Sequence, residues 1–416
     1  MNTPLQTVQG TARLVFDSVE GITNVVESMH ETIARRPLPW SPNPSEATRA
    51  HGLIASAVYS VIRGSNGALR EGVDRSLGFV PNATDTPHRS SAEIRTVAAL
   101  NGAFGDHLEA TGNPLAIPMG LMTPHQLLKV NNASLKASMP QASPHLVVLV
   151  HGLSMSELSW SRKGAPDIGG RLQDQLGCTP LYLRYNTGRH ISTNGQELAA
   201  LLQRLCEVWP VPVESLSLVG HSMGGLVIRS TCWYAERAQS GWLQQLQRVV
   251  CLGSPHHGSP LERAGHALDV AMQKTPYTAP LALGKHRSAG IKDLRHGNLL
   301  DEDWQGHDPD QPRPDTRKII PLPHGVDCYF AAATLGRDIH DPLGHVLGDL
   351  LVRLDSAVGL HTDDLRSLNI EPENCRVFHE KNHFDLVDDE RVHRQIIEWF
   401  EPVHGDAAKK QSHPKL

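Results

Sequence analysis

The chain has 416 residues, a length that suits one large catalytic domain carrying insertions or an N-terminal extension. Its hydrophobic fraction of 39% is ordinary for a globular protein, so a sizeable core can form. The formal net charge is −5, with both signs interspersed and no long basic block, which argues against nucleic acid as a partner.

The N-terminus and the cysteines indicate the compartment. The first residues, MNTPLQTVQG, lack the basic start and uninterrupted apolar run of a secretory signal. No stretch approaches the roughly 18 apolar residues of a membrane-spanning helix. The six cysteines lie in apolar segments, where free cysteine behaves as a small hydrophobe: Cys178, Cys206, Cys232, Cys251, Cys328 and Cys375. We therefore expect a soluble, cytoplasmic protein with free thiols.

Residues 1–140 are predicted to be mostly helical. A first apolar stripe recurs at three- and four-residue steps and ends at the Pro-rich run 37–44; it comprises Val15, Val19, Ile22, Val25, Val26, Met29 and Ile33. Two more periodic stretches follow at 53–77 and 94–108. Such a face can be membrane-active, but packing on a neighbouring domain is the ordinary outcome. We predict an N-terminal helical region that packs on the catalytic domain.

Short apolar runs alternate with helical patterns over residues 141–403. The runs predicted as strands are 145–152, 179–185, 215–220, 248–253, 327–334 and 375–379, with helices near 194–208, after residue 222 and near 388–400. Strand–helix alternation predicts an α/β fold with a mainly parallel sheet and helices on both faces. The tail 404–416 is expected to be flexible.

The long connection between the strands at 248–253 and 327–334 is predicted to be a lid insertion, at about 255–325. It contains helical patterns at 261–272 and 290–294 and a polar, Pro-rich run near 301–323. An insertion there lies over the carboxyl edge of the sheet, where such folds bind ligands. The basic segment 287–295, interrupted by Asp293, is expected to be a solvated lid helix, with contact to an anionic lipid as the alternative.

The candidate nucleophile is Ser222, in the segment Gly220-His221-Ser222-Met223-Gly224-Gly225. This segment fits the G-x-S-x-G pattern, follows a strand signal and precedes a helical one. A sharp strand-to-helix turn lifts the serine oxygen above the sheet, and the glycines leave room for the backbone to cross itself. The helix then points its first amides at the site.

An oxyanion hole is predicted from two backbone amides. Met223 follows the nucleophile, and Leu153 follows the loop His151-Gly152 at the end of the first strand. Acyl transfer needs two donors of this kind directed at the developing negative oxygen.

These segments resemble the lipase and esterase branch of the alpha/beta-hydrolase superfamily. The strand ending in Gly253-Ser254-Pro255-His256-His257-Gly258 is similar to segments in GPI inositol-deacylase-like esterases and bacterial triacylglycerol lipases. The resemblance covers about residues 140–400 and implies hydrolysis of carboxylic esters without a cofactor. It also implies that the catalytic acid and base follow the serine, in that order.

The acid has four candidates after the strand at 327–334: Asp338, Asp341, Asp349 and Asp355. The segment around Asp349 is similar to the family's Gly-Asp-Gly-x-Val, although Leu350 replaces the second glycine. Asp349 is therefore preferred, with Asp355 as the main alternative. For the base, His383 in the loop before the last helix is preferred to His379, whose side chain would tend to lie in the sheet.

The predicted function is a serine hydrolase that cleaves hydrophobic or lipid-like esters through an acyl-enzyme on Ser222. The predicted substrate-binding residues are His151, His221, His256 and His257. No metal is expected, because neither His256-His257 nor His340-Asp341 with His345 has a spacing that defines a site. An acyltransferase with the same triad and a catalytically silent binding protein are the alternatives. A peripheral contact with a lipid interface stays open, and the sequence carries no signal for an oligomeric state.

Overall fold

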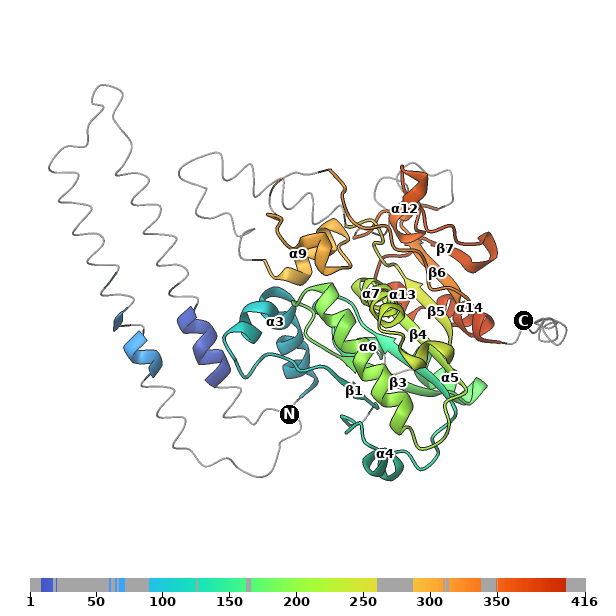
Figure 1. Ribbon diagram of the computed structural model, residues 1–416, viewed down its shortest axis with the longest axis horizontal. Helices are drawn as coiled ribbons and strands as arrows, with labels where there is room; N and C mark the ends of the chain where they lie inside the picture. Colours follow the sequence, from blue (N-terminus) through green and yellow to red (C-terminus); the bar gives the residue numbers. More distant parts are fainter. Residues whose placement is uncertain are drawn as a thin grey trace, which may run out of the picture.

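The computed structural model describes residues 9–17, 20, 60, 64–65, 67–71, 90–124, 126–161, 166–259, 287–309, 311, 314–337, 349 and 351–401. Most of the first two predicted helical stretches, the predicted helix at 261–272, and Asp338, Asp341, His340 and His345 lie outside these residues. Figure 1 shows the whole chain with its labelled elements.

The strands are β1 Gly120–Met122, β2 His145–Val150, β3 Thr179–Arg184, β4 Ser215–His221, β5 Leu246–Leu252, β6 Asp327–Thr334 and β7 Cys375–His379. The α-helices are α3 Ser91–Ala110, α4 Asn132–Ser138, α5 Ile168–Leu176, α6 Ile191–Val208, α7 Met223–Arg237, α9 Ala289–His296, α10 Asp301–Trp304, α12 Leu354–Ala357, α13 Asp385–Asp388 and α14 Glu390–Phe400. Short 3₁₀ helices occupy Glu157–Trp160, Gly241–Gln244, Asp364–Arg366 and Pro372–Asn374.

The strands of the described residues form one sheet in the order β1-β3-β2-β4-β5-β6-β7. β1 pairs antiparallel with β3, and every other neighbouring pair is parallel. β4 therefore lies near the middle, so its carboxyl end, where Ser222 follows, is flanked by strand ends on both sides. The predicted α/β class and each predicted strand are confirmed.

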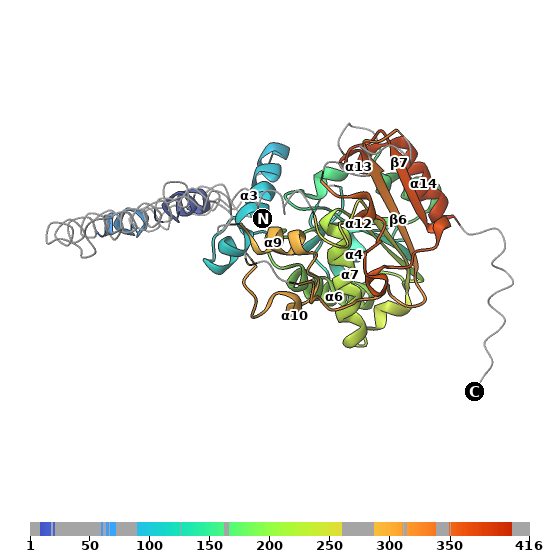
Figure 2. The same cartoon turned by 90° about the horizontal axis from the view of Figure 1, so that it is seen from above.

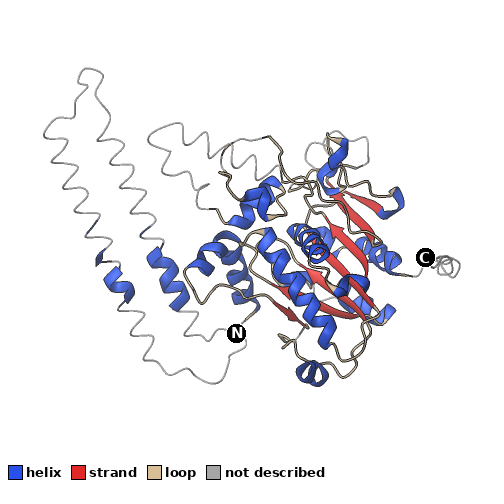
Figure 3. Ribbon diagram, in the orientation of Figure 1, coloured by secondary structure: helices blue, strands red, loops and turns tan. Residues whose placement is uncertain are grey.

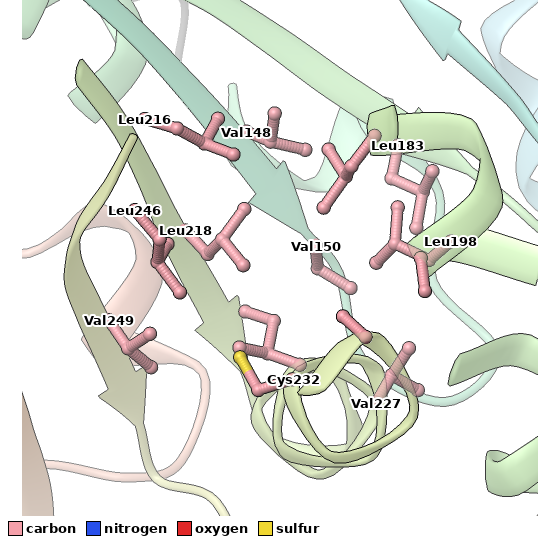
Figure 4. Packing of buried hydrophobic residues seen from close by; sticks show 14 of the residues in the cluster. Val148, Val150, Leu183, Leu198, Leu216, Leu218, Val227, Cys232, Leu246 and Val249 are labelled. Atoms are coloured by element: carbon pink, nitrogen blue, oxygen red, sulfur yellow. The ribbon is translucent and has the colours of Figure 1, made fainter. Parts of the chain in front are cut away.

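The sheet is buried on both faces, which explains its uninterrupted apolar strands. Alternate residues of β2 point to opposite sides: Val148 and Val150 pack in one core cluster, Val147 and Leu149 in the other. Helices α6 and α7 cover the first face, and α5 and α14 cover the second. Figure 3 shows the red strands of the sheet between blue helices. Figure 4 shows the first cluster, where β2, β4 and the start of α7 meet.

Helix α3 packs against α9 and the loops that follow β2 and β3 (Figures 1 and 2). Asn186 Nδ2 donates to the Gly105 carbonyl at 2.8 Å, and Ser288 Oγ donates to the Gly102 carbonyl at 2.6 Å. The periodic stretch predicted at 94–108 thus lies within a real helix. Residues 9–17 are also helical, and Leu14 packs beside the α3 residue Leu108.

The expectation that segment 287–295 is a solvated helix is wrong. Helix α9 covers this segment, but Asp293 and Arg295 are each only 1% exposed. The Asp293 carboxylate accepts hydrogen bonds from the Ile191 amide at 2.9 Å and from His190 Nδ1 at 2.9 Å. A buried carboxylate needs such donors. The charge of Asp293 therefore serves a contact with the start of α6 and does not face solvent.

All six cysteines are free, as predicted. Among the helices of the described residues, none combines the length and apolarity needed to cross a bilayer.

Candidate active site

Ser222 stands at a strained turn between β4 and α7. Its φ of 54° and ψ of −123° lie in a region that a side chain rarely adopts, at a cost of roughly 1–3 kcal/mol. The Ser222 amide donates to the Leu252 carbonyl at 2.8 Å, which fastens the turn to the end of β5. This strain is the feature that the predicted strand–serine–helix turn requires.

The glycines around Ser222 allow the backbone to fold back on itself. A Cβ on Gly220 would lie 2.6 Å from the Gly225 amide nitrogen. A Cβ on Gly224 would lie 2.1 Å from the Val150 carbonyl oxygen. Both distances are shorter than any contact a side chain could make, so only glycine fits at these two positions.

Asp349 and His383 form a buried hydrogen-bonded pair. His383 Nδ1 donates to Asp349 Oδ2 at 2.7 Å, and the two residues are 2% and 1% exposed. Asp349 Oδ1 accepts from the amides of Leu351, at 3.0 Å, and Val352, at 2.8 Å. With its Nδ1 donating, the imidazole has Nε2 as its remaining nitrogen, and Nε2 is buried without a partner among the described residues.

Asp355, the main alternative acid, occupies a different environment. It is exposed in the first turn of α12, and its backbone carbonyl accepts a hydrogen bond from the Leu360 amide at 2.8 Å. Among the described candidates, Asp349 is the one that contacts a histidine ring.

The loop that carries His383 is held close to Ser222. His221 Nε2 donates to the His383 carbonyl at 3.2 Å, and the two rings are 4.8 Å apart. Gly253 follows Leu252, whose carbonyl binds the Ser222 amide, and a Cβ on Gly253 would lie 3.1 Å from His383 Cε1. The three predicted triad residues therefore gather around the end of β5.

The loop after β2 approaches Ser222 from the other side. A Cβ on Gly152 would lie 3.0 Å from Ser222 Cβ, so the residue before Leu153 is in direct reach of the serine. Ser154 adopts a positive φ of 58°, and its amide donates to Thr187 Oγ1 at 3.1 Å. Met223 is the first residue of α7, where an N–H has no acceptor within its own helix.

The four histidines predicted to bind substrate take different places. His151, 1% exposed, donates from Nδ1 to the Gly152 carbonyl at 3.0 Å, and His221 supports the His383 loop. His256, 1% exposed, stacks on Phe330 with ring centres 4.4 Å apart. His257 Nε2 donates to the Gly359 carbonyl at 3.2 Å. Their roles toward substrate stay predictions.

Burial keeps His151 neutral, and this predicts an acid-sensitive fold. Desolvation lowers the pKa of His151 to about 4, whereas in the unfolded chain the value returns to about 6.5. Between these two values the unfolded state binds more protons at His151, so the contribution of this residue to stability is constant above pH 6.5 and falls as the pH drops toward 4. The loss from this one group reaches roughly 3 kcal/mol.

We expect His151→Gln to flatten the pH dependence of the unfolding free energy between about pH 6.5 and 4. Urea titrations at a series of pH values measure this slope. His145→Gln is the matched control, because the His145 side chain is 44% exposed. An unchanged slope in a folded His151→Gln variant would contradict the assignment.

Sequence reasoning missed the contact between α3 and the loop that follows β2. A Cβ on Gly102 would lie 2.0 Å from Ser154 Oγ, and one on Gly105 would lie 1.8 Å from Asn186 Oδ1. The available signal was the pair of glycines three residues apart inside an otherwise apolar helical stretch, which indicates close packing.

Residues 143–304 match the model of a family described as the PGAP1-like alpha/beta domain. Together with the strand order and the turn at Ser222, this match confirms the predicted resemblance to the alpha/beta-hydrolase superfamily, and the chain has the alpha/beta-hydrolase fold. The matched segment includes Ser222 but ends before Asp349 and His383. No curated protein matches the sequence.

Solved structures align with most of the chain at low identity. The mature lipase BlEst2 of Bacillus licheniformis is 16% identical, with 68% of this chain and 98% of that chain covered and a TM-score of 0.41. The naproxen esterase (carboxylesterase NP) of Bacillus subtilis is 13% identical, with 76% and 100% covered and a TM-score of 0.35. An esterase of Pyrococcus furiosus is 15% identical, with 62% and 82% covered and a TM-score of 0.37.

Proposed function

We propose that the chain is a serine hydrolase that cleaves carboxylic esters of hydrophobic or lipid-like substrates through an acyl-enzyme on Ser222. The observation that carries the proposal is the buried Asp349–His383 pair, whose Nε2 has no partner among the described residues. The loop of His383 lies at the end of β5, where the strained turn of Ser222 is also fastened. A general base needs one ring nitrogen free for the reaction, and the buried carboxylate on Nδ1 of His383 stabilises the imidazolium that forms when Nε2 takes a proton.

The reaction follows from these groups. His383 Nε2 takes the proton of Ser222 as Oγ attacks the ester carbonyl carbon, and the amides of Leu153 and Met223 stabilise the resulting oxyanion. Asp349 stabilises the imidazolium and holds the ring. His383 then gives the proton to the leaving alcohol, and an acyl-enzyme remains. Water, deprotonated by His383, attacks this ester, and the carboxylic acid leaves as Ser222 regains its proton.

A fluorophosphonate probe tests the assignment of the nucleophile. We expect one label per chain, located on Ser222 by peptide mass spectrometry, because only an activated serine attacks the phosphorus. The nearby Ser254 is 0% exposed and is an internal control for labelling by proximity alone. Labelling elsewhere, or none in protein that is folded, would contradict the proposal.

Nitrophenyl esters, supplied in solution and as dispersed droplets, test the substrate class. A jump in rate at the interface would mark a lipase, and equal behaviour would mark a soluble esterase. A competing alcohol in the same assay separates hydrolysis from acyl transfer, since a transferase would form a new ester instead of the acid.

A further inference from the structure

A cavity of about 400 Å³ lies between the N-terminal segment and the hydrolase fold. It falls within the roughly 300–1,000 Å³ range of small-molecule sites. Its far wall is apolar and comes from α3 and the segment before β2, with Ile94, Ala98, Leu115, Ile117 and Leu127 among its residues. The wall on the side of the loop after β2, called the near wall below, is polar and contains His151, Glu157 and Arg184.

The near wall adjoins the candidate nucleophile. Met155, which lines the cavity, places Sδ 3.1 Å from the position that a Cβ would take on Gly152, and Ser222 Cβ lies 3.0 Å from the same point. The sulfur and the serine carbon are therefore no more than 6.1 Å apart. The Met155 side chain therefore extends from the lining of the cavity to the immediate neighbourhood of Ser222.

The polar wall is internally paired and does not itself call for a charged ligand. Glu157 and Arg184 form an ion pair whose side chains are 6% and 18% exposed. His151 is neutral at physiological pH, because burial lowers its pKa to about 4. The remaining lining is mostly apolar, and it favours a ligand whose long part is uncharged.

The position along the sheet decides which end of an ester would occupy the cavity. The cavity borders β1, β3 and the loop after β2, whereas His383 follows β7 on the opposite side of β4. The leaving alcohol must lie on the His383 side, because that ring protonates it. The acyl chain, attached to the carbonyl carbon, is then directed past the oxyanion loop and toward the cavity.

We propose that this cavity binds the hydrocarbon chain on the acyl side of the substrate, so that the N-terminal segment determines chain-length specificity. The proposal rests on the proposed function, since it assigns one end of the ester cleaved at Ser222. Helix α3 contributes one wall, and its residues Gly102 and Gly105 hold that wall against the loops beside the serine.

Adjacent alanines on α3 provide the test. Ala98 lines the cavity and is 2% exposed, whereas Ala99 is exposed on the outer face of the same helix. We measure kcat/KM for nitrophenyl acetate, butyrate, octanoate and decanoate. In the native chain we expect a rise of about four-fold per methylene, which corresponds to roughly 0.8 kcal/mol. Ala98→Phe should lower the decanoate-to-acetate ratio by roughly ten-fold or more, and Ala99→Phe should leave it unchanged.

A second variant covers the case in which Ala98→Phe does not fold. Leu127 also lines the cavity and is 37% exposed, so Leu127→Gln can be tolerated while it makes the wall polar. This variant should also reduce the decanoate-to-acetate ratio. A folded cavity variant with the native chain-length profile, or an equal loss on every ester, would overturn the proposal while ester hydrolysis itself stands.

Decanoate binding, measured by calorimetry, shows whether the proposed ester hydrolysis or the proposed acyl-chain cavity is at fault if the esterase assays fail. We expect decanoate to bind the native chain and Ala99→Phe, and to bind Ala98→Phe at least ten-fold more weakly. If no ester is cleaved yet this pattern holds, the proposed function fails, while the cavity is still a site that binds a hydrocarbon chain. If decanoate binds all three proteins equally, the cavity assignment fails whatever the esterase assay gives.

Discussion

Ser222→Ala is expected to lower ester turnover by roughly four to six orders of magnitude, because it removes the atom that forms the acyl-enzyme. A residual rate above that in water should remain, since the proposed oxyanion amides of Leu153 and Met223 are left in place. Initial rates on a nitrophenyl ester measure the loss, and circular dichroism checks that the variant is folded. Turnover close to that of the native chain would refute the assignment of the nucleophile.

Ser222→Gly is a matched variant that separates chemistry from backbone strain. It removes the same oxygen, so it should be as inactive as Ser222→Ala. Glycine also relieves a strain of roughly 1–3 kcal/mol at φ 54°, against a loss of roughly 0.5–1 kcal/mol for its freer unfolded chain. Ser222→Gly should therefore unfold at higher urea than Ser222→Ala, as expected if the native chain keeps a strained serine for its reactivity.

The core of the fold could be predicted because its physical signals are local. Continuous apolar runs such as 146–150 are typical of a strand covered on both faces, and the order of strands and helices then implies a parallel sheet. The three-residue strand β1 gave no such signal. It is defined by its antiparallel pairing with β3, whose paired residues lie 60 to 64 positions later in the chain, and a pairing of this kind has no local periodicity.

Some parts of the candidate site could be predicted from the sequence, and others could not. The turn at Ser222 is encoded by consecutive residues, so its glycines and its strain could be anticipated. The partnership of Asp349 with His383 joins segments 34 positions apart, and spacing alone left Asp355 open. The burial of Asp293 and Arg295 and the approach of Gly102 to Ser154 depend on which surfaces meet, which a charge or apolar pattern does not specify.

Asp349→Asn is the second variant from which we expect a loss of roughly four orders of magnitude in kcat. The Asn oxygen can keep the hydrogen bonds that Asp349 Oδ1 accepts from the Leu351 and Val352 amides, so the loop should stay in place. Its NH₂ group then replaces Oδ2 opposite His383 Nδ1. Because that group donates, it forces the proton of the ring onto Nε2, and a protonated Nε2 is unable to accept the proton of Ser222.

Asp355→Asn is the matched control, since the same change is made six residues later on an exposed carboxylate. It should retain kcat within about two-fold and change stability by only a few tenths of a kcal/mol, the usual size of a lost helix-dipole interaction. Steady-state kinetics on both variants decide between the two acids. If Asp355→Asn loses the activity and Asp349→Asn keeps it, then the buried pair with His383 is structural, and the acid of the reaction comes from α12.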